Sequence, residues 1–145
     1  MKVLAINCSP RKNWNTAKLL KSALEDAKST GAEVEYMDLY DYVFTGCRAC
    51  DYSSYLKGSI DVELIFTMNA TEDFYEKLYK RPFEAYADEF RFLNGNIHVI
   101  PCFNTLQVHD YSKFNMASFS EEAKKKHHDE HFSLDLKKAY ERACS

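Results

Sequence analysis

Five polar side chains near the N-terminus have the types and the spacing to hold an oxyanion such as phosphate: Ser9, Arg11, Asn13, Asn15 and Thr16. Hydroxyl and amide groups donate neutral hydrogen bonds, and the guanidinium of Arg11 adds a fixed positive fork. An apolar run at residues 2–7 comes before them, and a helical pattern begins at residue 16. This order sets the free N–H groups and the positive dipole end of a helix beside the polar loop. The segment therefore predicts an anion-binding loop between a strand and a helix.

The rest of the chain alternates between strand and helix patterns, which predicts an α/β fold with parallel strands. Helical spacing predicts a helix over residues 16–30 that Gly31 ends, and a second helix that Thr71 caps and Pro82 kinks. One or two closing helices are expected over residues 121–131 and 134–143. We expect strands at residues 2–7, 33–39, 63–68 and 97–103. The first strand reads as fully buried and the second as an edge strand.

Three motifs in this order resemble the flavodoxin-like NAD(P)H-dependent FMN reductases and the related iron–sulfur flavoproteins. They are Cys8-Ser-Pro-Arg-Lys-Asn-Trp-Asn-Thr16, Asp38-Leu-Tyr40 and Gly46-Cys-Arg-Ala-Cys50. The family counterpart of the first motif is Gly-Ser-Pro-Arg-x-x-Gly-Asn-Thr. The resemblance implies that FMN is the cofactor, that NAD(P)H is the reductant, and that Ser9, Arg11, Asn13, Asn15 and Thr16 hold the flavin phosphate.

Both family glycines of the first motif are replaced in this chain, by Cys8 and by Trp14. Glycine serves there because it permits unusual backbone angles and close approach of the backbone to a phosphate. The Cβ of Cys8 is a small intrusion, whereas the indole of Trp14 is a large one. Two readings stay open for Trp14: it blocks the phosphate site or packs elsewhere, or it contacts the ligand.

The family's third strand, with its following loop, is missing after Gly58. In this fold class the strand order is 2-1-3-4-5, and FMN lies at the switch point between strands 1 and 3. We therefore expect one three-layer flavodoxin-like domain over residues 1–145, shortened to about four strands in the order 2-1-4-5. Because a central strand needs ladder partners on both edges, strand 4 should pair with strand 1, or a second copy should fill the gap.

Two further loops lie where doubly wound folds bind ligands, at the carboxyl ends of strands. Residues 67–70 follow the third expected strand, and Thr67 and Asn69 are the candidates there for shaping a flavin-ring pocket. Residues 104–111 follow the last expected strand and include His109 and Asp110.

The cysteines and histidines are weaker evidence for a site than the N-terminal loop is. Cys47 and Cys50 form a single C-x-x-C pair, with Ser53 where the iron–sulfur flavoproteins have a third cysteine. A cluster or a zinc site normally needs four ligands, so the pair favours a structural remnant over a reversible dithiol, and a dithiol over a cluster. His127 and His131 are four residues apart on a charged helix, which is more typical of a solvated face than of a metal site. We therefore expect no metal.

Composition and net charge limit the classes of partner that are expected. The chain has 145 residues, 46% hydrophobic and 28% charged, and a net charge of −3, which disfavours nucleic acid as a partner. No run is long enough to span a membrane, and five cysteines without a secretory signal indicate a reduced, cytoplasmic protein. The expected ligands are a flavin and a nicotinamide, and a homo-oligomer is expected.

The sequence thus favours an FMN-binding oxidoreductase whose flavin site is degenerate. The alternative is a flavodoxin-like binding or assembly module that no longer holds FMN and does no chemistry. A third reading is a thiol redox or metal protein that uses Cys47 and Cys50.

Overall fold

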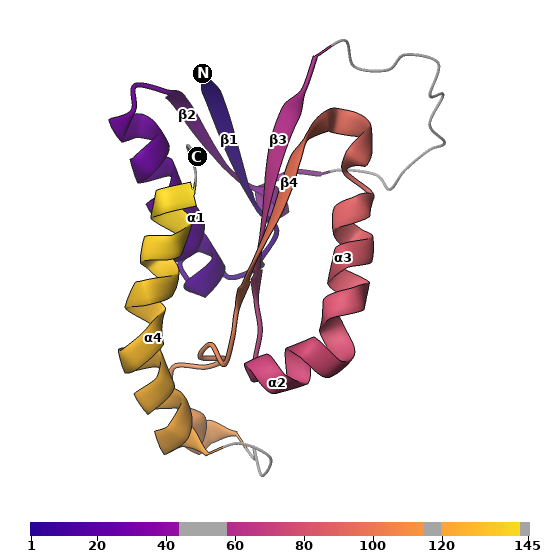
Figure 1. The fold of residues 1–145 in the computed structure, drawn as a ribbon. Coiled ribbons are helices and arrows are strands. Elements are labelled where there is room, and N and C mark those ends of the chain that lie inside the picture. Colours follow the sequence, from indigo (N-terminus) through magenta and orange to yellow (C-terminus); the bar gives the residue numbers. More distant parts are fainter. Residues whose placement is uncertain (44–57, 115–119, 143–145) are drawn as a thin grey trace.

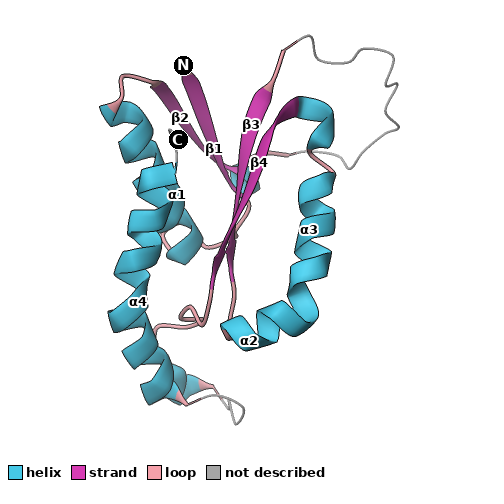
Figure 2. Cartoon of the chain, in the orientation of Figure 1, coloured by secondary structure: helices cyan, strands magenta, loops and turns pink. Residues whose placement is uncertain are grey.

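Parallel strands form at the four apolar runs, and helices connect them in an α/β chain (Figures 1 and 2). The structure is a computed structural model that describes residues 1–43, 58–114 and 120–142. Within these residues the strands are β1 (Lys2–Asn7), β2 (Glu33–Asp38), β3 (Ile60–Thr67) and β4 (Asn94–Cys102). The helices are α1 (Asn15–Ser29), α2 (Glu72–Phe74), α3 (Lys80–Asp88) and α4 (Glu121–Arg142). The expected α/β class with parallel strands is confirmed.

Helix ends follow the expected capping chemistry. Thr71 accepts a hydrogen bond from the Phe74 N–H at 3.4 Å and so caps α2. Gly31 has a φ of 86°, a left-handed angle that glycine adopts at no steric cost after α1. Residues 121–142 form one continuous helix rather than two.

The irregularity expected at Pro82 is present in the second helix. The helical run over residues 72–88 is divided by a π-helical turn over Tyr75–Tyr79, between α2 and α3 and just ahead of Pro82. Pro82 has no N–H to donate to the carbonyl four residues before it, that of Leu78, which lies in this turn.

The strands form two separate parallel ladders instead of one sheet. β1 pairs with β2, and β3 pairs with β4. The spatial order β2, β1, β3, β4 across Figure 1 corresponds to the expected order 2-1-4-5. The expected hydrogen-bonded pairing of β1 with β3 is wrong, however, since no ladder joins these two strands.

The core lies between α1, α4 and the inward faces of β3 and β4. Its members are Leu19 and Ala23 of α1, Ile100 and Cys102 of β4, and Phe132 and Ala139 of α4. On the opposite face of β3 and β4, Phe66 stacks on Phe83 of α3 with ring centroids 4.2 Å apart. Both faces of this ladder are therefore covered, which suits parallel strands.

Among the described residues, the β1–β2 ladder is covered on one face only. Ala5 and Asn7 of β1 are buried, whereas Leu4 is 49% exposed and Ile6 is 44% exposed. The prediction that β1 is fully buried is thus wrong, because successive side chains alternate between faces and α3 packs against β3 and β4 instead. None of the described helices combines the length and the apolarity needed to cross a membrane.

Candidate functional site

The turn that leaves β1 is held by Asn7, whose side chain is fully buried. The Asn7 amide donates to Asp38 Oδ1 on the neighbouring strand at 2.7 Å, and its Oδ1 accepts from the Ser9 N–H at 3.1 Å. The Ser9 hydroxyl in turn accepts from the Arg11 N–H at 3.3 Å. These bonds set the path of the loop toward α1, and Asn7 is a positioning residue that the sequence did not single out.

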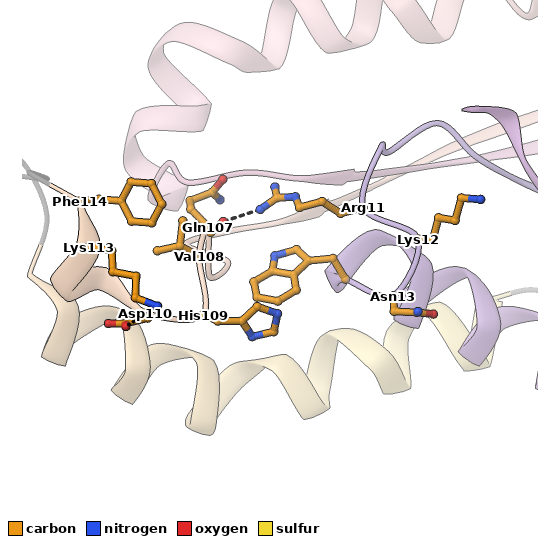
Figure 3. A pocket seen from close by; sticks show the side chains of 10 residues that line it. Arg11, Lys12, Asn13, Gln107, Val108, His109, Asp110, Lys113 and Phe114 are labelled. Carbon is orange, nitrogen blue, oxygen red and sulfur yellow. Dashed lines mark hydrogen bonds and ion pairs between the residues drawn. The ribbon is translucent and has the colours of Figure 1, made fainter. Parts of the chain in front are cut away.

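A second loop, which follows β4, crosses the start of α1. The carbonyl oxygen of Leu106 accepts from Trp14 Nε1 at 3.0 Å and from Asn15 Nδ2 at 2.9 Å. The Arg11 guanidinium donates to the carbonyl oxygen of Gln107, as the dashed line in Figure 3 shows. Residues more than ninety positions apart in sequence are thereby joined at one place.

Between these two loops lies a cavity of about 590 Å³. One wall comes from the first loop and the other from the segment after β4, and the side chains appear in Figure 3. The lining residues are Arg11, Lys12, Asn13, Trp14, Gln107, Val108, His109, Asp110, Lys113 and Phe114. The volume falls in the range of about 300–1,000 Å³ that is usual for small-molecule sites.

Trp14 is the central ring of the cavity wall. Its ring meets His109 edge to face at a centroid distance of 3.9 Å and an interplanar angle of 83°. The Arg11 guanidinium carbon lies 5.4 Å from the Trp14 ring centroid, within reach of a cation–π contact. Trp14 therefore lines the cavity. Contact of its ring with a ligand, one of the two readings left open, stays a prediction.

The charges around the cavity are partly paired. Lys12 forms an ion pair with Asp41, and the hydrogen bond from this lysine to Asp41 raises the pKa of Lys12. Asp110 lies 3.5 Å from Lys113, and hydrogen bonds from Ser112 lower the pKa of Asp110. Among the described residues no carboxylate forms an ion pair with Arg11, so its charge faces only carbonyl oxygen and an aromatic ring.

The predicted site residues divide into two groups. Arg11 and Asn13 line the cavity, whereas Ser9, Asn15, Thr16, Thr67 and Asn69 do not. Thr16 and Thr67 are brought together, with their hydroxyl oxygens 2.9 Å apart. Asn15 is only 4% exposed and is committed to Leu106, and the Asn69 carbonyl oxygen accepts from Lys124 at 3.4 Å.

The charged stretch of α4 is not uniformly solvated, which corrects the expectation from sequence. Lys124 is 2% exposed, and its Nζ donates to Asn104 Oδ1 at 2.8 Å. His127 and His131 stack with ring centroids 4.4 Å apart. Within the described ranges no group of three or more His, Cys, Asp or Glu side chains could hold a metal. Cys47 and Cys50 lie outside the described residues.

Two cavity residues, Lys113 and Phe114, lie beyond the segments that the sequence singled out. The available signal was the position of the segment after the last strand, which did point to His109 and Asp110. Lys113 ends a short 3₁₀ turn, Tyr111–Lys113, and Phe114 follows it; both line the same cavity as Trp14.

Comparisons with known proteins match the N-terminal part of the chain, which contains the loop between β1 and α1. A family model described as NADPH-dependent FMN reductase matches residues 1–83, which is more than half of the 145 residues. An iron-sulfur flavoprotein from Archaeoglobus fulgidus is 47% identical over 51 residues, a match that covers 35% of this chain and 25% of that protein. The match thus spans about a quarter of that relative's length. No solved structure matches the chain significantly.

Proposed function

Since this chain belongs to the NADPH-dependent FMN reductase family, we propose that it binds FMN beside the loop between β1 and α1 and acts as a flavin-dependent oxidoreductase. In this proposal Arg11 and Asn13 hold the phosphate. Ser9, Asn15 and Thr16 shape the loop from which these two side chains project, and Thr67 and Asn69 support the strand end beside it.

The observation that carries the proposal is the cavity itself. Four of its lining residues, Arg11, Lys12, Asn13 and Trp14, belong to the segment that the family model matches. The phosphate-loop segment of the family therefore borders a space of about 590 Å³, large enough for a mononucleotide.

Two features of the cavity lining support FMN as the ligand. The Arg11 guanidinium, with no acidic ion-pair partner among the described residues, suits a phosphate because its planar fork can donate two parallel hydrogen bonds. Trp14 and Phe114 offer aromatic surfaces, and rings of this kind commonly line cofactor pockets. When bound, the flavin supplies the hydride chemistry, and this chain's residues bind it and orient it.

The family also supplies the expected reductant, NAD(P)H, which we propose as the second ligand. We propose no iron–sulfur cluster for this chain, although the name of the archaeal relative includes one. The sequence provides a single C-x-x-C pair at Cys47 and Cys50, and a cluster normally takes four cysteine ligands.

One observation favours the alternative function, a binding module that does no redox chemistry. Donors of the loop region already have acceptors, because Trp14, Asn15 and Arg11 donate to backbone carbonyl oxygens. A site whose donors are occupied binds an anion more weakly than a site with free donors.

The test is equilibrium binding of FMN to the intact chain and to Arg11→Gln. Loss of a charged donor to the phosphate should weaken FMN binding about tenfold to a hundredfold. Lys28→Gln is the matched control, since it removes one positive charge from the far end of α1 and should leave the affinity unchanged. If Arg11→Gln binds FMN as tightly as the intact chain does, Arg11 does not hold the phosphate.

The rate of NADPH oxidation distinguishes an oxidoreductase from a binding module. If the FMN-loaded chain oxidises NADPH faster than free FMN does at the same concentration, the oxidoreductase reading holds. Stable FMN binding without faster NADPH oxidation would favour the binding module.

A further inference from the structure

Three side chains at or just before the start of α1 donate hydrogen bonds to backbone carbonyl oxygens of the segment after β4. Trp14 Nε1 and Asn15 Nδ2 both donate to the Leu106 carbonyl oxygen, and the Arg11 guanidinium donates to the Gln107 carbonyl oxygen. Two consecutive backbone carbonyls therefore lie over the N-terminus of α1, the part of the helix that attracts negative charge. Carbonyl oxygens with partial negative charge are a natural substitute for the oxygens of a bound phosphate.

The segment that carries these carbonyls is hydrogen-bonded to the loop after β3 at residues 104–105, its stem. It is held less firmly at residues 106–110, its tip. At the stem, the Thr105 N–H donates to the Met68 carbonyl at 2.9 Å, and the Asn104 N–H donates to the Ala70 carbonyl at 2.9 Å. Beyond the stem, the Gln107 N–H donates to the Tyr111 hydroxyl at 3.0 Å. His109 and Asp110 at the tip are exposed. Within the described residues, the hydrogen bonds that tie the tip to the rest of the fold are mainly those made by Arg11, Trp14 and Asn15.

We propose that residues 106–110 form a latch, in which the Gln107 carbonyl occupies the guanidinium of Arg11, the proposed phosphate donor, until a phosphate-bearing ligand displaces it. The bonds from Trp14 and Asn15 to the Leu106 carbonyl hold this latch closed. The inference rests on the proposed FMN site and concerns its regulation. Because each donor serves one good acceptor at a time, the latch and the phosphate compete. A change that loosens the latch raises the fraction of open chain, and so tightens phosphate binding by at most the same factor.

Trp14→Phe is the variant that tests the latch. Phenylalanine keeps an aromatic ring in the cavity wall and removes only the indole N–H that donates to Leu106. Losing one neutral tether should raise FMN affinity about three- to tenfold. Riboflavin, which has the same ring system without the phosphate, is the control ligand, and its affinity should not change.

Comparison of the two ligands makes each outcome decisive. A gain for FMN alone supports competition between latch and phosphate. An equal gain for both ligands means that the indole obstructs the ring, and a loss for both means that the indole stacks on the ring; each result overturns the latch and leaves FMN binding intact. Failure of the unmodified chain and the variant to bind FMN would refute the proposed function.

Hydrogen exchange with inorganic phosphate tests the latch without a flavin. Saturating phosphate should speed exchange of the Gln107 amide in the unmodified chain, since this N–H loses its Tyr111 partner when the tip moves. The Thr105 amide at the stem is the internal control and should keep its protection. Unchanged Gln107 exchange at saturating phosphate would contradict the latch even if FMN binds.

Discussion

The two parallel ladders of this molecule differ in how they are covered. The β3–β4 ladder has α1 and α4 on one face and α3 on the other, and Ile100 of β4 is 5% exposed. The β1–β2 ladder has α1 on one face, and Ile6 of β1 is 44% exposed on the other. Similar apolar strands thus contribute differently to stability, since hydrophobic stabilisation depends on the area removed from water.

The candidate site lies where these unequal halves meet. With no ladder between β1 and β3, the halves are joined by the α1 core, by the Thr16–Thr67 contact, and by the bonds from Trp14 and Asn15 to Leu106. One of these contacts, the hydrogen bond from Trp14 to Leu106, also positions a side chain that lines the cavity. Ligand binding and the union of the two halves should therefore be coupled.

The largest effect is expected where both halves share a core residue. Leu19 of α1 has no exposed surface and packs in the cluster with residues of β4 and α4. Leu19→Ala should lower the free energy of unfolding by about 2–5 kcal/mol, measured by urea denaturation. A loss below about 1 kcal/mol would mean that α1 does not unite the two halves.

A matched pair of isoleucines measures the difference between the ladders directly. Ile100→Ala should cost about 2–5 kcal/mol because the side chain is buried in the core. Ile6→Ala should cost about 1 kcal/mol, since much of that side chain is already in contact with water. Equal costs in urea denaturation would show that the open face of β1 is covered in solution.

The contact between Thr16 and Thr67 should be worth less. Replacing either threonine with valine should cost about 1 kcal/mol, because the hydroxyl that remains loses its partner. The double variant should be more stable than the sum of the single losses implies, with a coupling of about 0.5–1 kcal/mol in a double-mutant cycle. Strict additivity would mean that the two hydroxyls do not bond to each other.

The smallest effect is a pH dependence that arises from α4. Burial lowers the pKa of His127 and of His128, and the neighbouring His131 lowers the pKa of His127 further. The unfolded chain therefore takes up these protons first as the pH falls, so stability is present above the ordinary histidine pKa and is lost below it. Melting temperatures from about pH 8 to about pH 5 should fall less in a His127→Gln, His128→Gln double variant. An unchanged slope would assign the acid sensitivity to other groups.

Local patterns in the sequence predicted the local structure well. Helical spacing over residues 16–30 predicted α1, and Thr71 and Gly31 marked helix ends. Both features depend on neighbours within a few residues. The N-terminal loop motif also pointed to Arg11 and Asn13, which line the cavity.

Contacts between distant segments were harder to predict. Lys124 is buried because it reaches Asn104, and Leu4 is exposed because none of the described helices covers that face of β1. The bonds from Trp14 and Asn15 to Leu106 involve a backbone carbonyl, which leaves no side-chain signal in the sequence. Composition and periodicity carry no information about such pairs.

The most direct test of the FMN site is a titration of the intact chain with FMN, followed through Trp14, the single tryptophan of the sequence. Because Trp14 lines the cavity, bound flavin should quench its emission saturably, with one FMN for each chain. The unfolding midpoint should rise in parallel, since a ligand that binds only the folded state stabilises it. A folded chain whose emission and unfolding midpoint stay constant at high FMN concentration would contradict the account.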